Sequence, residues 1–76
     1  MTNEDQRKMI GERLREYRKS RGLSGYRIAK EGGIPEPRIR DIEEARSDYR
    51  ISSLIGYLNG CGLSLKITDS SGKDIF

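Results

Sequence analysis

Basic side chains are concentrated in one short stretch of this chain, where they could together bind a polyanion. Positions 13 to 27 hold six basic residues and one acidic residue, a local excess of five positive charges in a chain whose formal net charge is +3. Arginine can donate two parallel hydrogen bonds to a phosphate or a guanine. The pattern predicts an anionic partner such as nucleic acid, and the alternative is a solvated helix face. The six residues are Arg13, Arg15, Arg18, Lys19, Arg21 and Arg27.

Residues that perform catalysis or bind metal ions are scarce. The sequence has no histidine, the commonest general base and a frequent zinc ligand. The single cysteine, Cys61, has no second cysteine for a disulfide within the chain, and we expect it to pack in the interior in a reducing, cytoplasmic environment. We therefore expect a binding protein that is not an enzyme and that requires no metal or other cofactor.

Length and composition restrict the fold class. Seventy-six residues, of which 33% are hydrophobic and 36% charged, suffice for one small domain with a modest margin of stability. No apolar run reaches the roughly 18 residues that span a bilayer, and the first residues do not form a signal peptide, so we expect no membrane association. Apolar residues recur mostly at helical spacing, which predicts a mainly all-α bundle with a short β tail.

The first of four expected helices begins near the N-terminus. Asn3 can act as its N-cap, with Gln6 completing a capping box, and Gly22 ends it. Gly11 lies inside this helix and disfavours helical conformation, so the residues before it are expected to fray or to lie apart. This interpretation divides the chain into an N-terminal helical extension at 1–9, a domain at 10–62 and a tail at 63–76.

Three further helices are expected at 25–31, 37–45 and 51–60. Ser24 is a suitable N-cap for the second helix, and the third is expected to begin at Pro37 with Glu36 as its N-cap, because a residue before proline avoids helical conformation. The apolar stripe expected on the fourth helix consists of Ile51, Leu54, Ile55 and Leu58.

The tail has the period-two pattern of a β-strand. Leu63, Leu65 and Ile67 alternate with polar residues, and 70–73 is rich in turn-forming residues. The pattern predicts a strand at 63–67 and a short returning strand at 73–76. Because an isolated two-stranded hairpin is only marginally stable in water, the tail is expected to have a partner.

The second and third helices have the spacing of a helix-turn-helix unit. Ala29 must be small where the helices cross, Gly33 allows the tight turn, and Ile39 and Ile42 face inward. The order of these residues resembles the lambda-repressor and Cro-like, or xenobiotic-response-element (XRE), helix-turn-helix family over about 10–62. The matching residues are Ile10-Gly11-Glu12-Arg13-Leu14-Arg15, Arg18, Gly22-Leu23-Ser24, Ile28-Ala29, Gly33-Ile34, Ile39, Ile42-Glu43, Arg46 and Leu54.

The resemblance implies a bundle of four or five helices in which the third, Pro37 to about Glu44, enters the major groove of double-stranded DNA. It also implies an internal ion pair between Arg18 and Glu43, and the alternative is two separate surface charges. The chain departs from the family at Gly25, where glutamine is usual, and at Pro35 and Pro37, which puts in doubt which side chains face the bases.

The DNA contacts that the resemblance implies fall into two groups. The base-facing group is expected on the third helix, where Glu36 and Asp41 are alternatively a helix cap and a solvated acid. The backbone-facing group is expected at the start of the second helix and in the loop after the third, where Tyr26 and Tyr49 either contact the sugar-phosphate backbone or pack internally. The first group is Glu36, Pro37, Arg38, Arg40 and Asp41, and the second is Ser24, Gly25, Tyr26, Arg27, Arg46, Tyr49 and Arg50.

The tail is similar to that of HipB-type antitoxin repressors, in which a strand pairs with its equivalent in a second subunit. This similarity implies a homodimer that binds a palindromic operator, most simply as a repressor, and the alternative is a hairpin folded on its own domain. A second hypothesis is an antitoxin whose main role is to bind a toxin protein. The expected dimer contacts are Leu63, Leu65, Ile67, Ile75 and Phe76.

Overall fold

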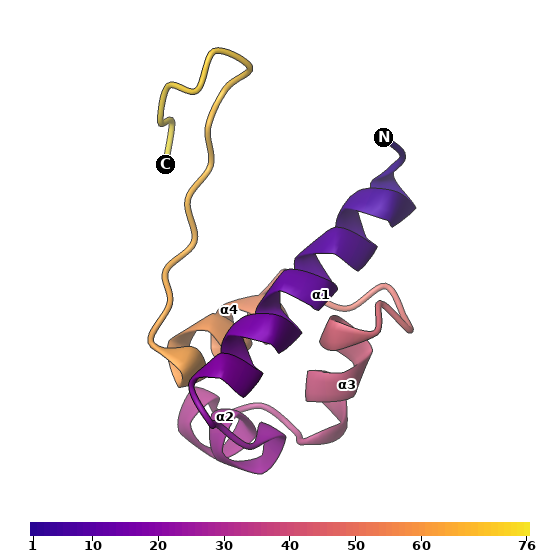
Figure 1. Cartoon of the computed structure of the whole chain (residues 1–76), viewed down its shortest axis with the longest axis vertical. Coiled ribbons are helices and arrows are strands. Elements are labelled where there is room, and N and C mark those ends of the chain that lie inside the picture. Colours follow the sequence, from indigo (N-terminus) through magenta and orange to yellow (C-terminus); the bar gives the residue numbers. More distant parts are fainter.

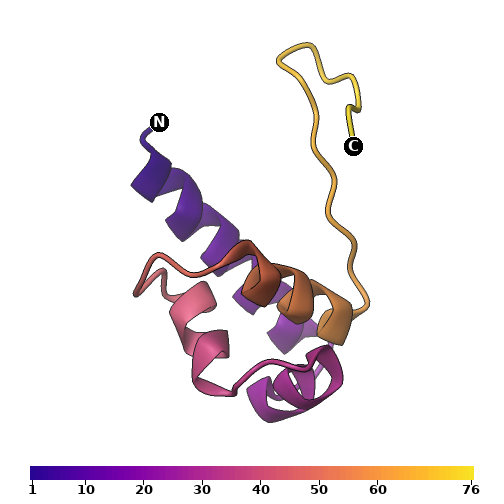
Figure 2. The ribbon, with the colours of Figure 1, turned by 180° about the vertical axis from the view of Figure 1, so that it is seen from behind.

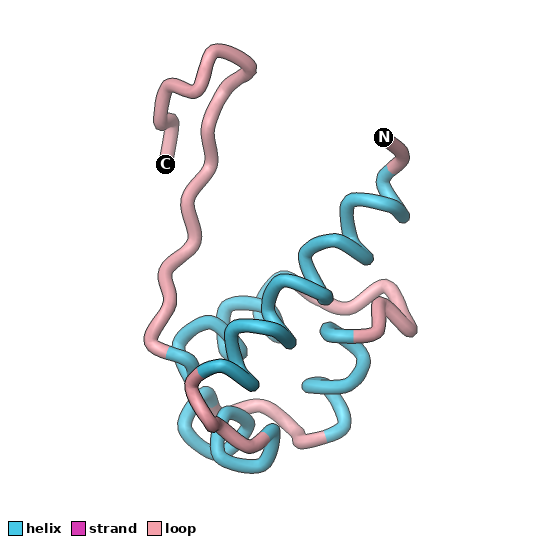
Figure 3. Tube along the Cα trace, viewed as in Figure 1, coloured by secondary structure: helices cyan, strands magenta, loops and turns pink.

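Four helices and an extended tail make up the chain in the computed structural model, which describes residues 1–76 (Figures 1 and 3). The mainly all-α class predicted from the sequence is confirmed, with four helices and no strand. No helix is long and apolar enough to cross a bilayer. The helices are α1 (Asn3–Ser20), α2 (Gly25–Gly32), α3 (Pro37–Glu43) and α4 (Ile51–Cys61).

The N-cap of helix α1 lies one residue earlier than predicted. Thr2 is the N-cap, and it forms a reciprocal capping box with Asp5, in which the Thr2 hydroxyl accepts from the backbone N–H of Asp5 at 3.0 Å. The prediction of Asn3 with Gln6 was therefore wrong, because two cap-competent residues are adjacent and the acidic residue at the third helical position favours the threonine. The helix ends at Ser20 with Arg21 as its C-cap, and Gly22 follows with φ +66°.

Gly11 is the point at which α1 crosses α3. A Cβ at this position would lie 2.5 Å from the carbonyl oxygens of both Ile42 and Glu43, so only glycine allows the two helices to approach this closely. Helix α1 is continuous through Gly11. Arg7 anchors this half of the helix by donating to the carbonyl oxygen of Ser47 at 2.7 Å.

The core lies where α2 and α4 pack against each other beneath α1 and α3. Ile28, Ile42 and Tyr57 are fully buried at its centre. Glycines on α2 and α4 bring the two helices close together, since a Cβ on Gly32 would lie 2.0 Å from the carbonyl oxygen of Gly56. This is the largest helix interface of the chain, and it fixes α2, the first helix of the helix-turn-helix unit, on the scaffold.

The buried stripe of α4 differs from the predicted one. Ile51 is 65% exposed and Ile55 is 41% exposed, whereas Tyr57 and Cys61 are buried. The helix is rotated because its glycines face α2, so that Leu54, Tyr57, Leu58 and Cys61 point inward. The periodicity of large apolar residues predicted that Ile51 and Ile55 are buried. The glycines of α4 face α2 instead, so these two isoleucines lie outside the core.

The tail leaves α4 at Gly62 and stands away from the helical body (Figures 1 and 2). Leu63 packs against the core, but the strands predicted at 63–67 and 73–76 do not form within the chain. The end of the tail folds back on itself through a tight turn, with one antiparallel bridge between Thr68 and Asp74 and backbone hydrogen bonds that join Ile67 to Ile75 and Phe76. The alternation of apolar residues is that of a strand, but a strand also requires a neighbour with which to share backbone hydrogen bonds.

Candidate nucleic-acid interface

Helix α3 has one buried side and one exposed side. Ile39 and Ile42 are 3% and 0% exposed and hold the helix on the core, while Pro37, Arg38 and Arg40 on the outer side are exposed. An α-helix with its side chains is about 10 to 12 Å across, which suits the roughly 12 Å width of a DNA major groove. Helix α3 is therefore presented as a rigid ridge with its outer side free.

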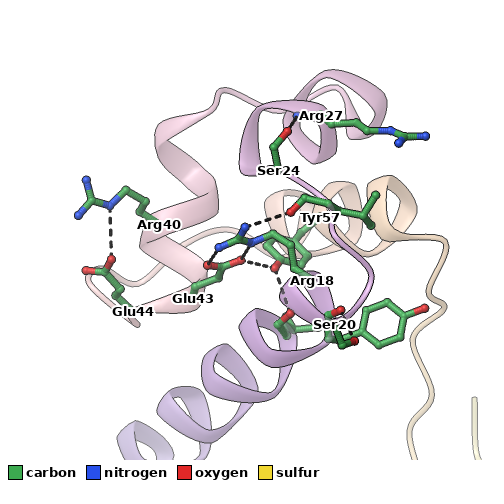
Figure 4. Close-up of polar contacts among 11 residues, drawn as sticks. Arg18, Ser20, Ser24, Arg27, Arg40, Glu43, Glu44 and Tyr57 are labelled. Atoms are coloured by element: carbon green, nitrogen blue, oxygen red, sulfur yellow. Dashed lines mark hydrogen bonds and ion pairs between the residues drawn. The ribbon is translucent and has the colours of Figure 1, made fainter.

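A buried polar cluster attaches this ridge to the other helices (Figure 4). Arg18 on α1 donates to both carboxylate oxygens of Glu43 on α3, from Nε at 2.6 Å and from Nη2 at 3.0 Å. Its Nη1 donates to the carbonyl oxygen of Leu23 at 3.1 Å. The hydroxyl of Tyr57 on α4 also donates to Glu43. Three helices thus meet at one carboxylate.

The ionisation of this cluster follows from its hydrogen bonds and burial. The hydrogen bonds that Arg18 donates to Glu43 raise the pKa of Arg18, which keeps the guanidinium charged. Burial, and then the hydrogen bond to Glu43, raise the pKa of Tyr57 far above its usual value, so the phenol keeps the proton that it donates. No buried polar side-chain atom in the chain is without a hydrogen-bond partner. The polar groups of the cluster are therefore all hydrogen-bonded.

The start of α3 follows the prediction in position but not in mechanism. Glu36 occupies the N-cap position, yet its backbone is helical and its side chain makes no capping hydrogen bond. The backbone N–H of Arg38 donates to the carbonyl oxygen of Pro35 at 3.0 Å, so the turn already begins at the first proline. The carboxylate of Glu36 therefore remains on the exposed surface.

The exposed surface of α3 is not itself basic. Two arginines are accompanied there by three acidic residues, Glu36, Asp41 and Glu44. Arg38 Nη1 lies 2.9 Å from Asp41 Oδ2, and Arg40 Nε lies 3.3 Å from Glu44 Oε2. The attraction for a polyanion must therefore come from residues that flank the helix.

A groove lies beside α3 where α1, α2 and α3 meet, and arginine side chains from two segments that flank α3 line it. Arg15 on α1 and Arg46 in the loop after α3 line it together with Gly25 and Arg40. Arg15 is not among the residues predicted to contact DNA. Its position four residues after Gly11, which places it on the side of α1 that faces α3, was the available signal.

The N-terminus of α2 opens on the same groove. The Ser24 hydroxyl accepts from the backbone N–H of Arg27 at 3.1 Å, and Tyr26 is 60% exposed. A Cβ on Gly25 would lie 3.2 Å from Ile39 Cγ2, a tight contact that accounts for glycine at this position. The charge of the Arg27 side chain is partly neutralised by Glu31, because Glu31 Oε1 lies 3.1 Å from Arg27 Nε.

The remaining predicted residues lie further apart. Arg46 and Arg50 are exposed in the loop that joins α3 to α4, whereas Tyr49 packs against the core, and burial raises its pKa. In the tail, Leu63 and Leu65 are partly buried. The predicted dimer contacts at the end of the tail, Ile67, Ile75 and Phe76, are 45%, 69% and 70% exposed.

A comparison with protein families agrees with this arrangement. Residues 14–67 match a helix-turn-helix family, HTH_3. The match covers more than half of the chain, and the protein therefore belongs to the helix-turn-helix family of the XRE, lambda-repressor-like type. It is a regulator of transcription that binds double-stranded DNA. No curated protein matches the sequence, and the likeness of the tail to HipB antitoxins is not supported.

Proposed function

We propose that the protein is a dimeric repressor that places α3 of each subunit in the major groove of a palindromic operator. The observation that carries the proposal is the ridge formed by α3, which Ile39, Ile42 and Glu43 hold from behind and which is free in front. The proposal assigns a binding role with no catalytic chemistry. A repressor that occupies a promoter blocks polymerase by occlusion, which requires no further activity.

The contacts divide between sequence recognition and anchoring. Arg38 and Arg40 project from α3 and suit the acceptors of guanine, while Pro37 suits a thymine methyl group. Arg27 on α2 and the arginines of the following loop suit phosphates, and Ser24 and Gly25 begin a helix whose N-terminal N–H groups can face a phosphate. The acidic side chains on α3 repel phosphates, so they favour discrimination over affinity.

The tail supports the dimer. The backbone N–H groups of 64–66 donate to no partner within the chain, and the side chains of Ile67, Ile75 and Phe76 are exposed at the end of the tail. Pairing with the same segment of a second copy would satisfy the backbone and cover the apolar side chains. A two-fold dimer would then present two copies of α3 about 34 Å apart, which matches half-sites one helical turn apart.

Selection of bound duplexes from a random pool tests the operator. The expected product is a pseudo-palindrome whose half-sites are separated by about 10 base pairs, centre to centre. Enrichment of a single unrepeated site would contradict the dimer, and a failure to enrich any sequence would contradict specific recognition. In binding assays, Arg38→Ala should reduce the preference for the selected site, whereas Arg27→Ala should weaken all duplexes alike.

The oligomeric state is tested separately by sedimentation of the full chain. The wild type should sediment as a dimer, and Leu65→Lys should shift it to a monomer because it places a charge in the paired segment. The matched control is Ser64→Lys, which changes the neighbouring exposed position. A wild-type monomer at all concentrations would contradict the dimer.

The exposed apolar end of the tail also suits a second candidate, an antitoxin that covers a toxin protein. Co-purification of the tagged chain from its native host distinguishes the two. A stoichiometric second protein that is lost from an Ile75→Lys, Phe76→Lys variant would favour the antitoxin, and recovery of the chain alone would favour the repressor.

A further inference from the structure

Asp41 is covered although it lies on the outer side of α3. Its side chain is 19% exposed, whereas that of Arg38, one turn earlier, is 48% exposed. Arg38 Nη1 donates to Asp41 Oδ2 at 2.9 Å. The carboxylate is therefore engaged and partly hidden, while the guanidinium beside it remains accessible.

The hydrogen bond leaves one edge of Arg38 free. A guanidinium has five N–H groups in a fixed planar fork, and Asp41 takes one of them at Nη1. Neither Nε nor Nη2 of Arg38 has a partner in the structure. Because these two nitrogens donate in parallel, they form the pair of donors that fits O6 and N7 of guanine in the major groove.

We propose that Asp41 is a positioning residue that holds Arg38 with this edge outward to read a guanine, so that each operator half-site contains a guanine opposite Arg38. The inference rests on the proposed function and adds the base that α3 selects. It assigns Asp41 a role through Arg38, in place of direct contact with cytosine.

Two physical reasons favour this division of roles. A free arginine loses side-chain entropy when it is immobilised on a base, and an arginine already held by a short side chain loses less. A carboxylate that faces the groove directly would be repelled by phosphates without compensation, whereas one paired with an arginine is neutralised.

The second pair on the helix serves as the matched control. Arg40 uses Nε, at 3.3 Å, to reach Glu44, so its Nε–Nη2 edge is not free. Both side chains are more exposed, at 71% and 42%. This second arginine–carboxylate pair has a looser geometry, and its removal should leave the guanine preference opposite Arg38 unchanged.

The experiment measures base preference position by position. Affinities of the full chain are determined for the selected operator and for all single-base variants of one half-site, at constant salt concentration. The wild type should prefer guanine at one position by roughly tenfold to a hundredfold. Asp41→Asn should lose most of that preference and leave the other positions unchanged, whereas Glu44→Gln should leave the preference at that position intact.

Two further measurements separate positioning from a structural role. Thermal unfolding of Asp41→Asn should match the wild type, since a pair this close to the surface adds little stability. In an Arg38→Ala background, Asp41→Asn should have no further effect on the guanine preference, because the residue acts through the arginine.

The remaining outcomes would overturn the inference. A loss of cytosine preference at a different position in Asp41→Asn would make Asp41 a direct base contact. An unchanged guanine preference in Asp41→Asn would show that the pair has no role in recognition. A wild type that binds no duplex would instead overturn the proposed function, and the positioning role with it.

Discussion

Removal of Arg18 from the buried cluster is expected to unfold much of the protein. The side chains of Arg18 and Glu43 are 18% and 5% exposed, so Arg18→Met would leave a buried carboxylate with only the hydroxyl of Tyr57 as a partner. Breaking a buried pair by removing one partner costs about 3 to 5 kcal/mol. A 76-residue domain has a total unfolding free energy of roughly 4 to 11 kcal/mol. The substitution therefore removes between about a third and all of the stability.

Urea denaturation followed by circular dichroism measures this loss. The matched control is Arg40→Met, which breaks an exposed pair and should cost less than about 1 kcal/mol. The unpaired Glu43 of Arg18→Met should have a raised pKa in the folded state. Stability lost by the variant at neutral pH should then be partly regained as the pH falls through that raised pKa, because protonation removes the buried charge.

Two results would refute this reasoning about the cluster. An Arg18→Met variant no less stable than Arg40→Met would mean that the buried pair does not hold α3 in place. A loss of stability that stays constant from neutral to mildly acidic pH would mean that the cost lies in packing and not in the unpaired carboxylate.

Three other perturbations follow from the packing, the thiol and the tail. Gly11→Ala should destabilise the fold by at least about 1 to 3 kcal/mol, because its methyl group meets backbone oxygens of α3, whereas Gly22→Ala, with no atom nearby, should show only the cost of its positive φ. The Cys61 thiol, whose pKa is raised by burial, should react with an aromatic disulfide reagent far more slowly in the folded than in the urea-unfolded chain. The hydrogen bonds from Ser71 and Lys73 lower the pKa of Asp69, so the amide signals of the turn should shift in NMR spectra as the pH falls through that lowered value, and Asp69→Asn should abolish the transition. Equal reaction rates for the folded and unfolded thiol, or turn signals independent of pH, would contradict the last two.

Much of the helical scaffold follows from local sequence signals. Ser24 and Gly33 mark the ends of α2 because a capping hydroxyl and a residue with positive φ act within one turn of chain. Pro35, two residues before α3, and Pro37, its first residue, similarly mark its start. Such signals depend on a few adjacent residues, and no distant contact competes with them here.

The packing of α4 and the tail depends on contacts that sequence patterns do not contain. The stripe on α4 was assigned from its large apolar residues, but Gly32 and Gly56 decide which side approaches α2. The alternation of apolar and polar residues in the tail indicates that it suits pairing with another strand. It does not indicate where in the chain, or on which other molecule, that strand lies. Both features depend on residues far away in the chain or outside it.

The candidate interface was predicted unevenly for a related reason. Arg18 and Glu43, paired at 2.6 Å, are 25 residues apart, and only the likeness to a family suggested that they meet. Arg15 was not assigned to DNA because the sequence alone does not distinguish it from the other basic residues of α1. The distinction requires knowing that α1 crosses α3 at Gly11. The pairing of Arg38 with Asp41 was open to prediction from their spacing of three residues, yet each was assigned to DNA separately.

The near balance of charge on α3 has a consequence for how substitutions can alter DNA binding during evolution. The ridge that is proposed to select bases adds almost no net attraction for DNA of its own, since its arginines lie beside carboxylates. Replacing arginines in the surrounding segments would alter how long the protein stays on any duplex while leaving its choice of sequence intact. Affinity for DNA and preference for a sequence thus depend on different parts of the surface, and each can change without the other.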